Sequence, residues 1–335
     1  MKTTTLFGNY MHRSRGRCAF FSLLITCFAF PPMAKAVVPP PDGGYPGFNT
    51  AEGQNALFSL TTGSANTAVG WFSLFSNAGG SFNTATGAGS LLFNTADANT
   101  AFGAAALLFN TTGINNTAVG AAALLHNTIA EENTATGAVA LSSNTEGDFN
   151  TANGAFALWV NTTGERNTAT GNSAMFSNTA GSRNTANGNA ALGNNITGND
   201  NTAIGSRALF FNLASGNTAI GADALSDNTA GNFNTATGHS ALAGNTIGQG
   251  NTDTGDSALA GNTEGSTNTA TGYSALSSNT EGGSNTANGS SALTDNTTGF
   301  GNTAIGGVRS RATPPVTPIS ASVFSLGSTS LRPIT

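Results

Sequence analysis

The pattern of apolar and polar positions repeats every 17 residues from Asn49 almost to the end of the chain. An Asn-Thr pair opens each of sixteen copies; thirteen of the fifteen spacings between copies are 17 residues and two are 16. If this Asn is numbered 0, Gly occupies +4 in every copy, and Ala occupies +2 in every copy except at Asp253. Leu occupies +8 in every complete copy except at Met175. A fixed period of this length predicts a solenoid in which each repeat forms one stacked coil.

The first five positions, Asn-Thr-Ala-x-Gly, predict a short strand whose alternate side chains face opposite sides. Ala at +2 is expected to face a crowded interior, whereas +3 varies freely (Val69, Phe102, Asn153), as an outward or lateral position does. Ala at +7 and Leu at +8 supply the buried side chains. The segment around them is compatible with a second strand or with a single helical turn, because the apolar run is too short for its period to decide.

The predicted fold class is therefore all-β, with or without one helical turn in each coil: a parallel β-solenoid or β-roll of 17-residue coils. The leucines expected in its core include Leu74, Leu91, Leu107, Leu124, Leu158, Leu209, Leu242 and Leu276.

Glycine at +4 and +14 predicts corners of the coil at which the backbone angles exclude a Cβ atom. The +4 glycines at these turns include Gly70, Gly120, Gly171, Gly221 and Gly272. In both short copies the missing residue falls after +11, which predicts an exposed turn at +13 to +16.

Asparagine at 0 and +11 is expected to stack from coil to coil as a ladder of amides, each hydrogen-bonded to the amides above and below it. The ladder at position 0 includes Asn66, Asn116, Asn150, Asn201, Asn234 and Asn285. We expect these asparagines to build the fold rather than to bind a ligand.

Position +9 distinguishes the two halves of the repeat region. It is apolar in most of the first ten copies and small or polar from the eleventh onward. Because one Leu and two or three Ala per coil make a thin core, lateral association with other chains would stabilise the solenoid. The apolar +9 residues are either additional core in the early coils or a lateral interface along the N-terminal half. They are Phe58, Phe75, Leu92, Leu108, Leu125, Trp159, Phe176 and Phe210.

Residues 1–36 predict a secretory signal peptide. Arginines precede a 13-residue apolar run, Cys18 to Phe30, and Ala34-Lys35-Ala36 forms a small-x-small cleavage site. The run is too short to span a bilayer. A lipoprotein signal ending at Cys27 is the alternative, which Thr26 before the cysteine disfavours. We expect export through a bacterial inner membrane to the cell surface or the medium, with no membrane span after the signal is removed.

The remaining chain divides into a Pro/Gly-rich linker (37–48), the repeat region (49–306) and a Pro-rich tail (307–335) that abandons the repeat. Codons can be chosen for Thr313 to Ser320 such that the same DNA, read one base upstream, encodes Asn-Thr-Thr-Gly-Asn-Thr-Asn-Ile, in phase with the repeat. The hypothesis is a frameshift near Gly307 that removed further repeats and any following domain. Third-position bases in the gene that forbid this frame would contradict it.

Copies such as Asn66-Thr67-Ala68-Val69-Gly70 resemble the head repeats of YadA-like trimeric autotransporter adhesins. The longer phrase, with Ala106-Leu107 followed by Asn-Thr-Thr-Gly at 110–113, is similar to bacterial surface and phage tail-fibre repeats. The resemblance covers residues 49–306. It implies a homotrimer exposed outside the cell and used for attachment to a cell-surface or glycan ligand. The copies are longer than those of YadA-like heads, and neither a heptad stalk nor a membrane-anchor segment follows residue 306.

Charge and motif content narrow the function further. After residue 36 there are 6 Arg, no Lys and 16 Asp or Glu, a net charge of −10, which disfavours nucleic-acid binding. His126 and His239 occupy different positions of distant coils, and no catalytic triad, metal-ligand spacing or phosphate-binding loop is present. We therefore expect a non-enzymatic protein without catalytic residues, cofactor or metal.

Two alternatives to attachment are a fibre-like scaffold without a specific ligand and an ice-binding solenoid. Thr at both +1 and +3 resembles the Thr-x-Thr faces of ice-binding solenoids, but it occurs in only six copies. Only three of these are adjacent, at Thr235/Thr237, Thr252/Thr254 and Thr269/Thr271, whereas a flat ice-binding plane needs many in register.

Overall fold

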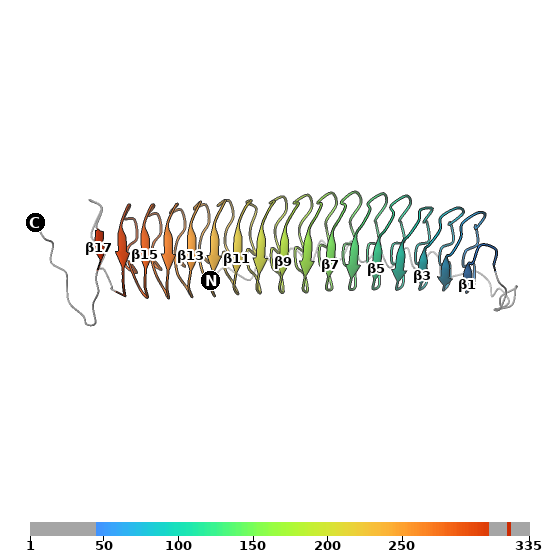
Figure 1. Ribbon diagram of the computed structural model, residues 1–335, viewed down its shortest axis with the longest axis horizontal. Helices are drawn as coiled ribbons and strands as arrows, with labels where there is room; N and C mark the ends of the chain where they lie inside the picture. Colours follow the sequence, from blue (N-terminus) through green and yellow to red (C-terminus); the bar gives the residue numbers. More distant parts are fainter. Residues whose placement is uncertain (1–44, 308–319, 323–335) are drawn as a thin grey trace, which may run out of the picture. The chain divides into compact units, whose positions relative to one another are not determined.

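The computed structural model describes residues 45–307 and 320–322, which form a parallel β-solenoid (Figure 1). Each copy of the repeat makes one coil with a three-residue strand at +1 to +3. Successive strands pair in parallel with a shift of one repeat, so that Ala152 lies opposite Ala169. This arrangement confirms the all-β solenoid predicted from the 17-residue period, and the described residues contain no helix.

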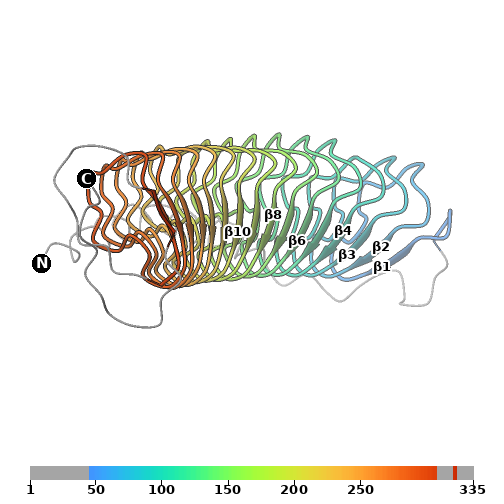
Figure 2. The same cartoon turned by 60° about the vertical axis from the view of Figure 1, so that its left-hand side comes forward.

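The strands are β1 (Thr50–Glu52), β2 (Thr67–Val69), β3 (Thr84–Thr86), β4 (Thr100–Phe102), β5 (Thr117–Val119), β6 (Thr134–Thr136), β7 (Thr151–Asn153), β8 (Thr168–Thr170), β9 (Thr185–Asn187), β10 (Thr202–Ile204), β11 (Thr218–Ile220), β12 (Thr235–Thr237), β13 (Thr252–Thr254), β14 (Thr269–Thr271), β15 (Thr286–Asn288), β16 (Thr303–Ile305) and β17 (Ser320–Ser322). They line up along one side of the coils, and the remaining residues of each coil close it through turns (Figure 2).

Strand β17 comes from the tail that the sequence places outside the repeat. It pairs in parallel with β16, and Ser320 lies opposite Thr303, so the register of one repeat is kept. The rest of the tail lies outside the described residues, as do the predicted signal peptide and most of the predicted linker. The frameshift therefore stays a hypothesis.

The segment from +5 to +10 is neither a second strand nor a helical turn. It is a series of turns in which the residues at +6 and +8 have positive φ, for example 60° at Phe156 and 50° at Leu158. The peptide groups here point along the solenoid axis. The N–H of Phe156 donates to Ala138 O in the preceding coil (3.1 Å), and that of Leu158 donates to Ala174 O in the following one (3.0 Å). Because a left-handed residue costs roughly 1–2 kcal/mol, these inter-coil hydrogen bonds are needed to hold the turn.

The interior of most coils contains Ala at +2 and +7, Leu at +8 and the two asparagines, as Ala152, Ala157, Leu158, Asn150 and Asn161 illustrate. All of these side chains are buried. The leucines predicted for the core are fully buried without exception: Leu74, Leu91, Leu107, Leu124, Leu158, Leu209, Leu242 and Leu276. The core is therefore a mixture of aliphatic groups and hydrogen-bonded amides, and the coils of a single chain surround it.

Candidate functional surfaces

The asparagines at position 0 lie inside the solenoid and form a continuous ladder. The backbone N–H of Asn167 donates to Asn150 Oδ1 (3.0 Å), and Asn167 Nδ2 donates to the same oxygen (3.1 Å) and to Gly181 O (2.8 Å). The members named from the sequence, Asn66, Asn116, Asn150, Asn201, Asn234 and Asn285, are all buried.

The asparagines at +11 form a second ladder that meets the first. Asn178 Nδ2 donates to Asn161 Oδ1 (2.8 Å) and to Gly181 O (2.9 Å), and Asn178 Oδ1 accepts from Asn195 Nδ2 (2.9 Å). In this coil the carbonyl at +14 thus accepts from both asparagines, whereas Asn133 Nδ2 has no hydrogen-bond partner within the described residues. Since their amides are used inside the solenoid, these asparagines do not reach a ligand on its surface.

The two short coils keep this junction although they lack one residue. In residues 83–98, the carbonyl of Ala96 accepts from Asn83 Nδ2 and Asn94 Nδ2, both at 2.8 Å. Ala214 does the same for Asn201 and Asn212 in the second short coil. The deletion therefore removes a residue between +11 and the shared carbonyl and leaves the hydrogen bonds intact.

Glycine is favoured at +4 and at +14 for two different reasons. Gly171 at +4 has φ of 125°, and an added Cβ would lie 2.5 Å from Gly188 O of the next coil. The other turn glycines named from the sequence, Gly70, Gly120, Gly221 and Gly272, also have φ between 128° and 136°. At +14 the prediction of unusual backbone angles was wrong, because Gly181 does not have a left-handed φ. Its Cβ would instead come close to Asn178 Oδ1, so the ladder favours glycine there, although Ala130 occupies +14 in the coil that starts at Asn116.

The threonines divide into a bonded row and an unbonded row. At +12 the hydroxyl donates to the +12 carbonyl of the next coil, as from Thr162 to Thr179 O (3.0 Å). The Thr at +1 of β1–β16 points outward, and within the described residues none of these hydroxyls has a hydrogen-bond partner. We call the outward side chains at +1 and +3 of β1–β16 the strand face. At +3 it also carries exposed apolar groups such as Phe102 and Ile204.

The apolar +9 residues lie at the surface, outside the cluster of buried core residues. Phe58 is 68 % exposed, and the others are partly buried except Leu125, which is covered. Except at Leu125, this exposure places the +9 row outside the core, and the lateral interface stays a prediction. We define the apolar stripe as these +9 residues together with Phe72, Phe93, Phe109 and Phe156, which lie beside them. The +9 row of the stripe consists of Phe58, Phe75, Leu92, Leu108, Leu125, Trp159, Phe176 and Phe210.

Ring contacts connect the aromatic members of the stripe from coil to coil. Phe58 and Phe75 stack with ring centroids 5.2 Å apart and planes 7° from parallel. Trp159 lies 4.8 Å from Phe176 and 6.0 Å from Phe156. The +6 residues in these contacts were missed in the sequence, although their spacing of three from +9 was a usable signal.

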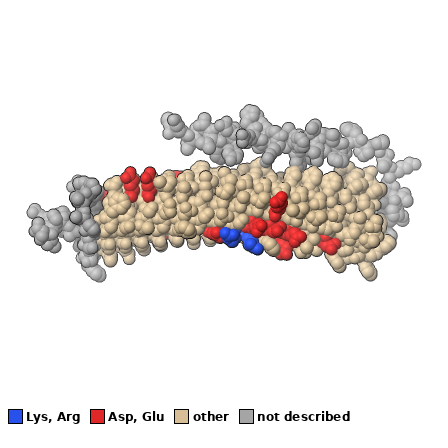
Figure 3. All heavy atoms as spheres, turned by 90° about the horizontal axis from the view of Figure 1, so that it is seen from above, with Lys and Arg blue, Asp and Glu red and all other residues tan. Residues whose placement is uncertain are grey.

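Charge is distributed unequally around the coil. From residue 49 to residue 200, positions +5 to +10 contain no Asp, Glu, Lys or Arg, and His126 is their only titratable group. The acidic residues of this part lie mainly in the turn at +13 to +16: Glu131, Glu132, Glu146, Asp148, Glu165 and Asp200. Figure 3 shows acidic groups gathered near the middle of one face, beside a few basic groups. Hydrogen bonds from Arg183 lower the pKa of Asp200 on this surface.

The histidines serve local contacts in distant coils. His126 stacks on Phe109 at 5.4 Å, and its Nδ1 is 2.9 Å from Ser142 O. His239 Nδ1 is 3.4 Å from Asp256 Oδ2. In the part of the chain that the structure describes, no group of three or more His, Cys, Asp or Glu residues is arranged to hold a metal ion.

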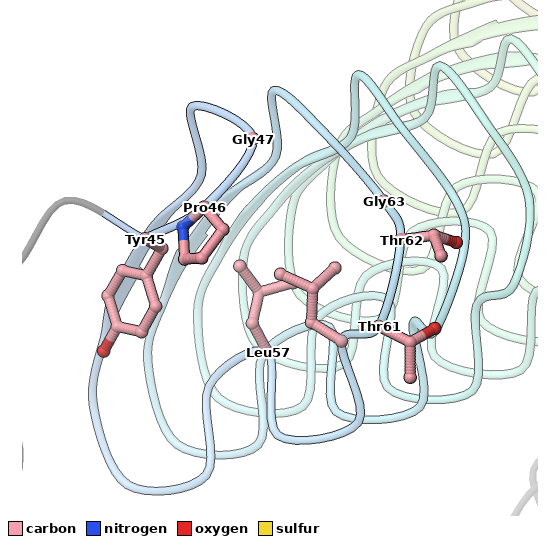
Figure 4. A pocket seen from close by; sticks show the side chains of 8 residues that line it. Tyr45, Pro46, Gly47, Leu57, Thr61, Thr62 and Gly63 are labelled. Atoms are coloured by element: carbon pink, nitrogen blue, oxygen red, sulfur yellow. The ribbon is translucent and has the colours of Figure 1, made fainter.

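A hollow of about 340 Å³ lies at the N-terminal end of the solenoid (Figure 4). Tyr45, Pro46 and Gly47 lie on one side of it, and Leu57 with Thr61 to Gly63 on the other. No charged group lines the hollow, which leads to Leu57 at the end of the core.

The fold defines the protein as a parallel β-solenoid. The sequence matches no protein-family model and no curated protein sequence. Within residues 45–307 and 320–322, no helix is long and apolar enough to cross a membrane.

Proposed function

We propose that the protein is a non-enzymatic attachment rod that acts outside the cell as a homotrimer. The observation that carries this proposal is the apolar stripe, which lies outside the core and has no Asp, Glu, Lys or Arg beside it from residue 49 to residue 200. The resemblance of the repeats to trimeric adhesin heads and tail fibres supports the same function, and the predicted signal peptide fits export.

The dimensions of the stripe support association between chains. With about 4.8 Å between coils, ten coils extend over roughly 45 Å. Contiguous apolar patches larger than a few hundred Å² are rare on monomeric proteins and mark interaction sites. A second and a third copy supply such a patch. In the first nine coils the absence of Asp, Glu, Lys and Arg beside the stripe removes repulsion between these acidic chains, whereas in the tenth coil Arg207 lies over the Phe210 ring at 5.1 Å.

Replacing Phe75 and Phe176 together by serine is expected to convert the trimer into monomers. Each buried aromatic side chain contributes about 1.5–3 kcal/mol, so the double variant should weaken association at least a hundredfold. Because both residues lie outside the leucine core, the thermal midpoint of the isolated chain should change little. Sedimentation velocity with circular dichroism measures both quantities.

The matched control is Ala243→Ser with Ala260→Ser, which places serine at +9 of two later coils. This control should remain trimeric. A Phe75→Ser/Phe176→Ser chain that is still a trimer would contradict the role of the stripe.

Attachment itself is tested by binding. We expect the labelled chain to bind whole cells or immobilised cell-surface polysaccharides saturably, and unlabelled chain to compete for the same sites. A trimer that binds none of these surfaces would contradict attachment and favour a scaffold without a specific ligand.

One observation favours a second candidate, binding of ice through the strand face. The hydroxyls at +1 form a regular row with no partner in the described residues, and β12, β13 and β14 carry Thr at both +1 and +3. Thermal hysteresis in the original protein would establish this function if the double substitution Thr252→Lys with Thr269→Lys abolished it. Ordinary freezing of a concentrated solution of the chain would exclude it.

A further inference from the structure

Asp253 is the one residue other than alanine at +2, and it lies inside the solenoid. It is the central residue of β13 and is fully buried. In the sheet it lies between Ala236 of β12 and Ala270 of β14. The sequence marks Asp253 as an exception to the repeat. Because +2 faces inward, the exception places a carboxyl group in the core.

The carboxyl group of Asp253 has no hydrogen-bond partner in the described part of the chain, at either oxygen. Burial removes its hydration and raises its pKa to about 8. The backbone at Leu242 and Thr254 is near enough to offset part of this rise, although it makes no hydrogen bond of acceptable geometry.

The coil that contains Asp253 differs from the other complete coils in its turn. In the fourteen others, the N–H at +7 donates to the carbonyl at +4 at 3.2–3.4 Å, as from Ala241 to Gly238 O and from Ala275 to Gly272 O. The described residues make no such bond between Ala258 and Gly255. Gly255 also has the largest φ of the +4 glycines, 149°. The buried carboxyl and the missing turn bond occur in the same coil.

Among the residues that the structure describes, no other titratable side chain faces Asp253. The side chains that point into the coils starting at residues 234, 251 and 268 are alanine, leucine and asparagine. On the outer surface of these coils, His239 and Asp256 pair at 3.4 Å with both side chains about half exposed. Three further groups of these coils are also exposed to solvent: Glu264, Tyr273 and Glu281.

We propose that Asp253 makes coil 251–267 a pH-sensitive joint in the rod, closed while its carboxyl is protonated and opened as the proton is lost. Because each coil of a solenoid contacts only its neighbours, one coil can open while the rest stay stacked. Opening at this coil separates the described C-terminal coils from the longer N-terminal stack.

The direction of the pH effect follows from the two states. In the closed coil Asp253 keeps its proton up to about pH 8, whereas in an opened, hydrated coil it loses the proton near the ordinary aspartate pKa of 3.8. Between these values each pH unit favours the open coil about tenfold. The joint is therefore tightest in acid, weakens as the pH rises to about 8 and changes no further above that.

Amide hydrogen exchange on the full chain at pH 5 to 9, corrected for the intrinsic exchange rate, tests this proposal. We expect protection in residues 251–267 to fall up to tenfold per pH unit between pH 5 and 8, while residues 150–166 stay constant. Asp253→Ala restores the repeat residue, so this variant should fold, be protected more strongly and show no pH dependence. Asp253→Asn, which cannot ionise, should also be independent of pH.

The control is Asp256→Ala, which removes the surface pair with His239 and should keep the pH dependence of the original chain. An identical pH profile in the original chain and in Asp253→Ala would overturn the proposal. Loss of protection spread evenly along the solenoid would overturn it as well, because the joint must be local.

Discussion

Asn178→Asp is expected to lower the free energy of unfolding of the solenoid by roughly 3–5 kcal/mol at neutral pH. In the original protein Asn178 Nδ2 donates to Asn161 Oδ1 and Gly181 O. A carboxylate in the same place can donate to neither, and it brings a charge into a fully buried ladder without a counter-ion. Urea unfolding followed by circular dichroism measures the loss. Because burial raises the pKa of the introduced carboxyl, part of the loss should be recovered as the pH falls toward about 4, where the protonated acid again has a donor.

The matched control is Asn189→Asp, because Asn189 is an exposed asparagine at +5 with only a 3.4 Å contact to Asn172 O. Surface substitutions of this kind change stability by about 0.5 kcal/mol or less. Equal effects of the two substitutions would show that the amide ladder does not hold the coils together.

Gly171→Ala is the second substitution with a large expected effect, about 3 kcal/mol or more. Two costs combine here. An alanine at φ of 125° is strained by roughly 1–3 kcal/mol. Its Cβ would also lie 2.5 Å from Gly188 O, which is fixed in the neighbouring coil. Thermal and urea unfolding of the full chain measure the effect.

Two comparisons make this prediction specific. Gly79→Ala should be neutral or slightly stabilising, because an added Cβ would meet only Thr62 Oγ1 at 3.4 Å and the unfolded chain loses freedom. Gly181→Ala at +14 should fall between the two, since Ala130 already occupies +14 of another coil. A milder effect at Gly171 than at Gly181 would contradict the role assigned to the +4 backbone angle.

The fold was predictable because the positions that face inward can be recognised in the repeat itself. Ala at +2 and Leu at +8 recur with a constant period. A stack of equal coils is the simplest fold that buries residues with such a period. The segment around +8 was not predictable. Leucine has no preference for positive φ, and Leu158 adopts it only because the neighbouring coils fix the direction of its N–H group.

The candidate surfaces were predictable in part. Sequence reasoning identified the +9 row but could not choose between core and surface, because that depends on how the turn places Phe75 relative to Leu74. The sequence also could not predict that both amide ladders donate to one carbonyl, such as Gly181 O, because this too depends on the path of the turns. This junction joins residues 3 and 14 positions apart, and only the closed coil brings them together.

In the proposed function the rod is an assembly of chains joined by the apolar stripe. Sedimentation equilibrium of the exported chain, over a wide range of concentration, measures the number of chains per particle directly. We expect three chains in the original protein and one in Phe75→Ser/Phe176→Ser, with the same circular dichroism spectrum. A single chain per particle in the original protein at every concentration would contradict the claim.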